Sequence, residues 1–147
     1  MQLNACTHGA LRILMSCAEA GGEPVTMVGM AQSLGLTEAL VVKACHRLMR
    51  AGYLKGMRGR GGGYLLGRPA GEISLLEVVR LFEDEDDLFP CRLQADGDCR
   101  IAAICRLRVA CDAAHSAFSA VLRDTAIGDL AHASNGAARS RREPVGV

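Results

Sequence analysis

The stretch that decides the fold is TEALVVKACHRLMRAGYLKGMRGRGGGYLLGRP, residues 37–69. Thr37 can cap a helix that runs to Arg50, with apolar residues on one face and mostly basic residues on the other. Residues 53–58 and 64–66 read as short strands, and the glycine-rich run between them is typical of a hairpin tip. A basic, glycine-rich hairpin directly after such a helix is typical of the wing of a DNA-binding domain.

Two earlier helices complete this pattern on the N-terminal side. Residues 3–18 place apolar side chains at helical spacing until Gly21 and Gly22 end the pattern. Thr26 can cap a second helix that ends at Gly35, because glycine readily adopts the left-handed conformation of a C-cap. Two short helices joined by a tight turn predict a helix-turn-helix, whose second helix enters the major groove of DNA.

The rest of the chain is predicted to be mostly helical. Ser74 and Glu77 form a capping box that opens a helix through Phe82, and the acidic run that follows is too polar to pack. From Ile104 onward, apolar residues recur at alternating spacings of three and four, which predicts a long helix with a dimerisation seam. We therefore expect a mainly α protein, in which a winged helix-turn-helix domain with a two-stranded wing precedes a long C-terminal dimerisation helix. The expected divisions are the DNA-binding domain at 1–82, an acidic, cysteine-bearing loop at 83–101, the dimerisation helix at 102–130 and a disordered tail at 131–147.

Charge is distributed unevenly along the chain, although the formal net charge is only +1. Up to Ala70 there are eight Lys and Arg against three Asp and Glu, and after it nine against thirteen. The basic first part is suited to meet a polyanion such as double-stranded DNA, and the acidic second part is not.

Composition also excludes several classes of protein. Hydrophobic residues make up 50% of the chain, enough to fill a core, and the low aromatic content of 3% favours helices over sandwiches or barrels. We expect neither a signal peptide nor a membrane span, and hence a cytoplasmic location. The glycine run lacks the ending of a phosphate-binding loop, and no nucleophile motif is recognisable, so no enzyme is predicted.

The expected DNA contacts come from the recognition helix and the wing. Basic side chains neutralise phosphates, and a thin arginine-bearing hairpin suits the narrow minor groove. The start of the recognition helix offers few base-reading groups, so sequence discrimination is expected from Lys43, His46 and the wing. The predicted DNA-binding residues are Thr37, Lys43, His46, Arg47, Arg50, Arg58, Arg60, Gly61, Gly62 and Arg68.

Three of the seven cysteines form a candidate metal site. Cys91, Cys99 and Cys105 have seven and then five residues between them, and clustered cysteines in a reduced protein usually serve metal or redox chemistry. Thiolates are the soft ligands of iron-sulfur clusters, whereas structural zinc sites generally use shorter gaps. The residues favour a cluster and leave open a redox thiol pair or three unconnected cysteines.

The remaining cysteines and the histidines are interpreted separately. Cysteines on apolar helix faces are expected to pack as small hydrophobes, and these are Cys17, Cys45 and Cys111. A cluster with three cysteines leaves one coordination position, for which His8 on the first helix is the preferred candidate. A solvated surface histidine is the alternative for this residue, and His115 and His132 are weaker candidates.

Several short motifs together resemble one known family. They are Met1-Gln2-Leu3, Arg50-Ala51-Gly52-Tyr53, the run from Arg58 to Gly63, Pro69 and the cysteine triplet that ends in Cys105-Arg106-Leu107. Over about residues 1–130 the chain resembles the Rrf-type winged-helix regulators. The resemblance implies that the helix 37–50 lies in the major groove and that Arg58, Arg60, Gly61 and Gly62 form the wing. It also implies that Cys91, Cys99 and Cys105 hold an iron-sulfur cluster, of either the two-iron or the four-iron form.

Within that family, the residues are most similar to the nitric-oxide-sensing branch. There an Asp at the place of His8 completes the site from the partner subunit's first helix. The branch that controls cluster assembly has a His shortly after the third cysteine, where this chain has Arg108. The resemblance thus implies a homodimeric repressor that binds a palindromic operator and responds to nitric oxide. The alternatives are an iron-responsive regulator, a cluster-free thiol redox regulator, and a module that binds another protein through the acidic run and the seam helix.

Overall fold

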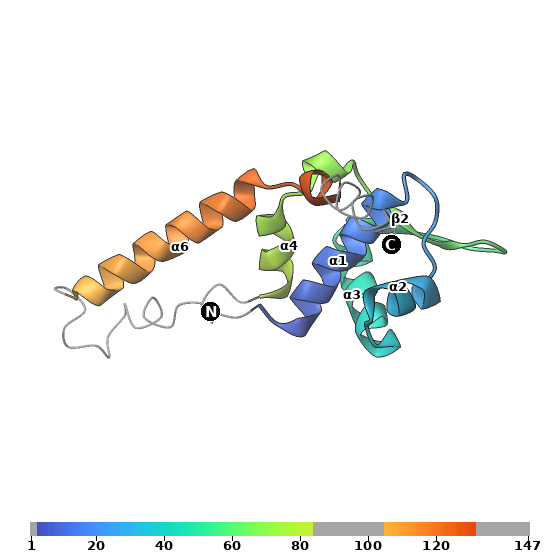
Figure 1. The fold of residues 1–147 in the computed structure, drawn as a ribbon, viewed down its shortest axis with the longest axis horizontal. Helices are drawn as coiled ribbons and strands as arrows, with labels where there is room; N and C mark the ends of the chain where they lie inside the picture. The colour runs from blue at the N-terminus through green and yellow to red at the C-terminus, as the bar shows by residue number, and fades with distance from the viewer. Residues whose placement is uncertain (1–2, 84–104, 132–147) are drawn as a thin grey trace, which may run out of the picture.

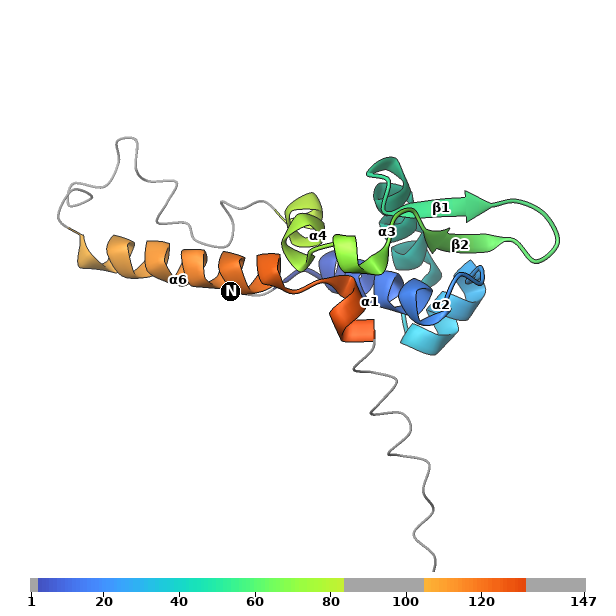
Figure 2. The same ribbon diagram turned by 90° about the horizontal axis from the view of Figure 1, so that it is seen from above.

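The computed structural model describes residues 3–83 and 105–131. The elements are α1 (Ala5–Glu19), α2 (Met27–Leu34), α3 (Glu38–Arg50), β1 (Leu54–Met57), β2 (Gly63–Leu66), a short 3-10 helix (Ala70–Glu72), α4 (Leu75–Phe82) and α6 (Arg106–Asp124). Figures 1 and 2 show α1 to α4 and the hairpin gathered together, while α6 extends away from them. The prediction of a mainly α winged helix-turn-helix protein with a long C-terminal helix is confirmed.

The helix-turn-helix is formed by α2 and α3, and each helix begins at its predicted cap. The hydroxyl of Thr26 accepts a hydrogen bond from the amide of Gly29 at 3.1 Å, and that of Thr37 accepts one from Leu40 at 3.3 Å. Gly35 ends α2 with a φ of +60°, a conformation that other residues adopt only with strain. Three local signals therefore fix the turn between the two helices.

The wing is the antiparallel hairpin of β1 and β2, in which Leu54 lies opposite Leu66. Val25 and Tyr64 exchange two backbone hydrogen bonds, of 3.0 and 2.8 Å, which attach β2 to the segment before α2. Figure 2 shows the hairpin tip projecting beyond the helices. The wing is thus fixed at its base and extended at its tip.

Gly67 lies where the chain leaving the wing passes the end of α3. A Cβ atom on this residue would lie 2.1 Å from the carbonyl oxygen of Gly52, while the Gly67 amide donates to the carbonyl of Tyr53 at 2.8 Å. We expect Gly67→Ala to lower the free energy of unfolding by about 2 kcal/mol, because the backbones must separate. Denaturant unfolding measures this loss. Gly71→Ala is the matched control, because nothing lies within 4 Å of its Cβ position, and equal losses in the two variants would contradict the close approach.

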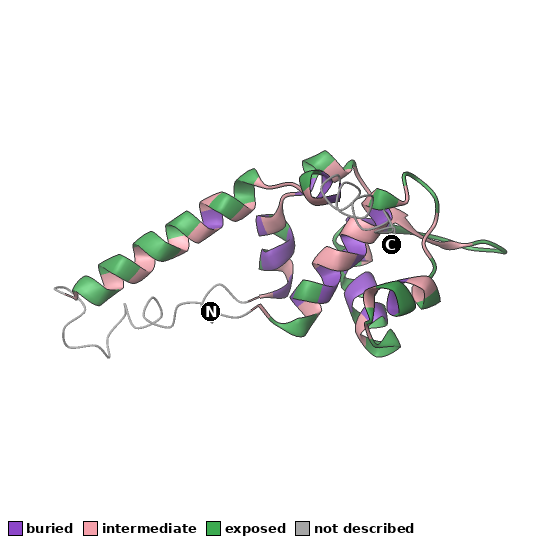
Figure 3. Cartoon of the chain, in the orientation of Figure 1, coloured by how far each residue is buried: buried purple, intermediate pink, exposed green. Residues whose placement is uncertain are grey.

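The core lies between α1, α3 and α4, whose buried faces point toward one another in Figure 3. Ile13 of α1, Val41 and Leu48 of α3 and Val78 of α4 are fully buried. The predicted capping box opens α4, since the hydroxyl of Ser74 accepts a hydrogen bond from the amide of Glu77. The resulting arrangement holds α3 against the domain by one face and leaves its other face exposed.

The expected single helix over 102–130 is corrected in the structure, because α6 ends at Asp124. Ala126 pairs with Ser74 in an isolated bridge, and a further helical turn begins at Ile127. The amide of Ile127 donates to the carbonyl of Ile73 at 2.9 Å, and the Ile127 side chain is fully buried in the core. After the helix, the chain therefore returns to the core that α1, α3 and α4 form.

The predicted apolar seam of α6 is half-buried at some positions and exposed to solvent at others. Cys111 and Phe118 are half-buried, whereas Leu107 and Val121 are 62% and 65% exposed. Figure 3 shows α6 as largely exposed, and Ser119 is buried within it. An exposed apolar stripe runs along this helix at heptad spacing, and its members are Leu107, Ala110, Ala114, Ala117 and Val121. The predicted acidic loop beyond Glu83 and the tail from residue 132 lie outside the described residues.

Candidate nucleic-acid interface and cysteine site

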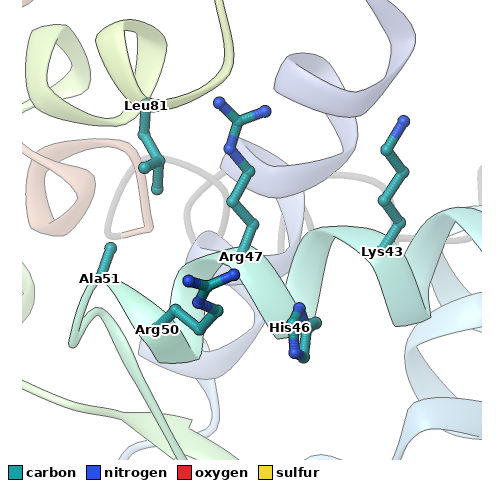
Figure 4. A pocket seen from close by; sticks show the side chains of 6 residues that line it. All are labelled: Lys43, His46, Arg47, Arg50, Ala51 and Leu81. Carbon is teal, nitrogen blue, oxygen red and sulfur yellow. The ribbon is translucent and has the colours of Figure 1, made fainter.

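The exposed face of α3 carries most of the predicted DNA-binding side chains. Lys43, His46, Arg47 and Arg50 are all exposed on it, while Ala44, Cys45 and Leu48 on the opposite face are buried. In Figure 4, Lys43 and Arg47 extend toward the side where Leu81 of α4 lies, and His46 points the other way. Three cations on one helix face create a positive surface suited to phosphates.

The wing presents the second group of predicted residues. Arg58 and Arg60 are exposed beside a tip in which Gly59 and Gly61 have φ angles of +106° and +86°. A Cβ atom on Gly62 would lie 2.4 Å from the carbonyl oxygen of Met57, so the turn requires glycine there. The glycines allow a thin tip that brings the two arginines outward.

Arg68 lies at the base of the wing and is held by neighbouring side chains. Its guanidinium lies 4.4 Å from the centre of the Tyr53 ring and forms an ion pair of 3.3 Å with Glu77. The Tyr53 hydroxyl also donates to Glu77 at 3.5 Å, and the pKa of Tyr53 is raised, first by burial and then by the Glu77 charge. These contacts favour a structural role for Arg68 between the wing and α4 over the predicted contact with DNA. The DNA contact stays an untested prediction.

Arg47 also contacts α4, although it lies on the exposed face of α3. Its guanidinium carbon is 5.0 Å from the centre of the Phe82 ring. Phe82 is itself buried, with a relative exposure of 6%. Phe82 and Glu83 are the last described residues before the segment that contains Cys91 and Cys99. The recognition helix is therefore in direct contact with the entrance to the cysteine-bearing segment.

Glu83 fixes the same entrance to the start of α1. Its carboxylate accepts hydrogen bonds from the amide of Asn4, at 2.8 Å, and from the fully buried hydroxyl of Thr7. The side-chain amide of Asn4 donates to the carbonyl of Phe82 at 3.1 Å. Glu83 was expected to begin an exposed acidic run, and this is corrected, because its carboxylate is the partner of a buried hydroxyl. We call Asn4, Thr7, Arg47, Phe82 and Glu83 the α4 junction.

Of the three predicted cluster cysteines, only Cys105 falls within the described residues. It is half-buried at the N-cap of α6, and its side chain makes no capping hydrogen bond. Its thiol is therefore not committed to capping the helix. Cys91 and Cys99 lie outside the described residues, and within 3–83 and 105–131 no three His, Cys, Asp or Glu side chains are grouped to hold a metal ion.

The predicted fourth ligand, His8, is exposed on the first turns of α1. Figures 1 and 2 both show the start of α6, whose N-cap is Cys105, at the end of the molecule far from α1, the helix that carries His8. His115 is half-buried on α6, and His132 lies outside the described residues.

Cys17 and Cys45 behave as the sequence predicts for packing residues. Both are buried, and burial raises the pKa of Cys17 to about 12 and that of Cys45 to about 11. The charge of Cys45 contributes further to the raised pKa of Cys17. Thiols with such pKa values remain protonated at neutral pH, and a protonated thiol is a poor metal ligand. Cys111 is half-buried on α6.

Two exposed apolar residues on α3 and β1 were not predicted. Val42 on α3 is 48% exposed and Met57 on β1 is 51% exposed. Helical spacing could have identified Val42, because it lies one turn from both Ala39 and His46 on the exposed face.

Comparison with known proteins identifies the family. Residues 3–133 match Rrf2, described as an iron-dependent transcriptional regulator. The chain belongs to the Rrf2 family. A Rhizobium meliloti relative, protein aau3, is 37% identical and covers 90% of this chain and 86% of its own length. The HTH-type transcriptional repressor NsrR of Streptomyces coelicolor is 35% identical and covers 92% of both chains.

A solved structure shares the Rrf2 fold. The T. potens IscR structure matches with a TM-score of 0.73 at 20% identity, and the match covers 99% of this chain and 94% of that one. The Rrf2 family consists of transcriptional regulators, so this chain is a winged-helix transcriptional regulator and not an enzyme. Of the described helices, none has the length and apolar character needed to cross a bilayer.

Proposed function

We propose that this Rrf2 protein is a homodimeric, DNA-binding repressor whose affinity for a palindromic operator is controlled by an iron-sulfur cluster that responds to nitric oxide. The observation that carries the proposal is the similarity to a transcriptional repressor named NsrR, at 35% identity over 92% of both chains. The α4 junction supports it, because this junction connects the cysteine-bearing segment to the recognition helix.

DNA binding is assigned to the exposed side chains of α3 and the wing. Lys43, His46 and Arg50 on α3 face the major groove, and Arg58 and Arg60 contact the minor groove or its phosphates. Because the affinity comes largely from phosphate contacts, it should fall steeply as salt is raised.

Arg60 and Arg68 separate the DNA-binding role from the structural one. We expect Arg60→Ala to weaken DNA binding at least about fivefold and to lower the slope of log affinity against log salt by about one, because one phosphate contact is lost. Arg68→Ala should leave that slope unchanged and lower the free energy of unfolding by about 1 kcal/mol, because its contacts are with Tyr53 and Glu77. Titration of a fluorescent duplex at several salt concentrations measures the slopes. An Arg60→Ala affinity within twofold of the parent would exclude the wing contact.

The cluster is assigned to Cys91, Cys99 and Cys105. The chemistry of the donor set fits, since three thiolates are available and Cys105 lies at a helix N-terminus without a capping role. When bound, the cluster supplies iron that reacts with nitric oxide. His8 of the partner subunit is the proposed fourth ligand, because α1 of the same chain, which carries its own His8, lies far from the start of α6.

The dimer is assigned to the exposed apolar stripe on α6. A stripe of one Leu, three Ala and one Val at heptad spacing lets two helices approach closely. Pairing of α6 would present two recognition helices to a palindromic site, in which adjacent major grooves lie about 34 Å apart. A second copy would also bring its own α1, and with it a second His8, into the assembly.

The α4 junction is the proposed route from the cysteine-bearing segment to DNA. A change in the position of the segment after Glu83 would act on Phe82, and through its ring on Arg47 of α3. The same change would act on the start of α1 through Asn4 and Thr7. A shift of about 3 to 5 kcal/mol between two arrangements would change operator occupancy almost completely.

Anaerobic purification followed by titration tests the proposed function. We expect a brown protein with bound iron and sulfide, whose DNA binding changes when nitric oxide is added. A response to an iron chelator but not to nitric oxide would favour the iron-responsive alternative. A colourless protein whose DNA binding changes on thiol oxidation would favour the cluster-free redox regulator. A colourless protein that binds no DNA would favour the remaining alternative, a module that binds another protein.

A further inference from the structure

An apolar patch interrupts the charged face of the recognition helix. Val42 is 48% exposed, and the exposed methyl of Ala39 lies one turn before it on the same face. The residue before Val42 is Val41, which is fully buried, so only the second valine of the pair is available for contact with another molecule. Helix stability does not explain a valine at this exposed position, because valine has a lower helix propensity than alanine or the long polar residues.

The surroundings of this patch identify its partner as DNA. The next residue is Lys43, and His46 lies one turn further along, with Arg47 and Arg50 completing a cationic surface on the same helix. A protein partner would have to bury these charges, whereas the phosphates that border a major groove neutralise them. The patch therefore lies where base edges are read.

Only one apolar group is available on base edges in the major groove. The C5-methyl group of thymine is the only methyl group there, and the other groups that distinguish the base pairs are hydrogen-bond donors and acceptors. Valine has a single strongly preferred side-chain rotamer in a helix, so its methyl groups are already oriented before DNA binds. Val42 can make no hydrogen bond, so it cannot distinguish bases by any polar contact.

We propose that Val42, assisted by Ala39, is a specificity-determining residue that reads a thymine methyl group in each half of the operator. The inference rests on the proposed function, because it requires that α3 enters the major groove. It adds the class of base that the exposed face of α3 selects. His46, one turn from Val42, then contacts the neighbouring base pair.

The test begins by selecting binding sites from randomised duplexes, with the full chain purified anaerobically and again after iron chelation. In the best selected duplex, each thymine is then replaced singly by deoxyuridine, which lacks the methyl group and keeps the same hydrogen-bonding groups. We expect one thymine in each half-site at which this replacement weakens binding about fourfold, as expected for one buried methyl group. Replacing both should weaken binding about fifteenfold if the two halves contribute equally.

Two variants assign the effect to its residue. Val42→Ala should bind the thymine duplex more weakly and show no further loss with deoxyuridine, whereas Val28→Ala should keep the full sensitivity. Val28 is the matched control, because it is a 54% exposed valine on α2. Alanine is the better helix former, so thermal unfolding should find Val42→Ala at least as stable as the parent.

The possible outcomes test the proposed DNA-binding function and the inference about Val42 separately. Selection of no common sequence in either form would overturn the proposed function, and the inference with it. A common sequence that has no methyl-sensitive thymine, or whose sensitivity persists in Val42→Ala, would overturn the inference alone and leave the DNA-binding function in place.

Discussion

Replacement of Cys105 by serine is expected to yield a folded protein that binds no iron-sulfur cluster. The hydroxyl is a poor ligand for iron compared with a thiolate, so iron affinity should fall by more than about 100-fold, beyond what the loss of an outer-shell partner causes. The fold should survive, because Cys105 is the N-cap of α6 and serine is among the best N-cap residues. DNA binding should then no longer respond to nitric oxide.

Iron and sulfide content, the visible absorption spectrum and operator affinity together measure this result. Cys6→Ser is the matched control, since Cys6 is also half-buried and is not assigned to the cluster. It should keep the cluster and the response. Iron and sulfide at parental levels in Cys105→Ser would show that this residue is not a ligand.

Truncation of Ile127 to alanine should cause the largest loss of stability among the changes considered. Ile127 is fully buried although it follows α6, and its amide donates to the carbonyl of Ile73 at 2.9 Å. Loss of the side chain leaves a cavity in the core of the DNA-binding half, which should lower the free energy of unfolding by about 3 kcal/mol. Denaturant unfolding at a fixed protein concentration measures this, because a dimer adds a concentration-dependent term.

Met57→Ala is the control for this truncation. Met57 is a large apolar residue that is 51% exposed on the wing, so its loss should change stability by less than about 0.5 kcal/mol. A comparably small loss for Ile127→Ala would mean that the segment after α6 does not contribute to the core.

Local signals in the sequence were sufficient to predict the winged helix-turn-helix. Thr26, Thr37 and Ser74 each accept the amide hydrogen bond that their cap positions imply. The glycine-rich tip likewise forms the predicted hairpin. These features depend on residues a few positions apart, so a pattern of neighbouring residue types carries the information.

Features that depend on distant contacts were not predictable in the same way. The hydrogen bonds of Glu83 to the start of α1 and the burial of Ile127 each join segments far apart in sequence. The ion pair of Arg68 with Glu77 joins two separate elements, the base of the wing and α4. Periodicity indicates which face of a helix is apolar, but it does not indicate where a helix stops when a bridge such as that of Ser74 and Ala126 interrupts it. Binding of a cluster by Cys91 and Cys99 stays a prediction, because both lie outside the described residues.

The return of the chain to the DNA-binding half after α6 has a consequence for biosynthesis. Ile127 fills a position beside Ile73 in the core, and that position stays empty until the chain has been synthesised through residue 127. The nascent N-terminal helices can form early, but their hydrophobic interior cannot close before the cysteine-bearing segment and α6 have emerged. A chain that ends before Ile127 would therefore lack part of the core that supports α3, so few such truncated copies would stay folded in the cell.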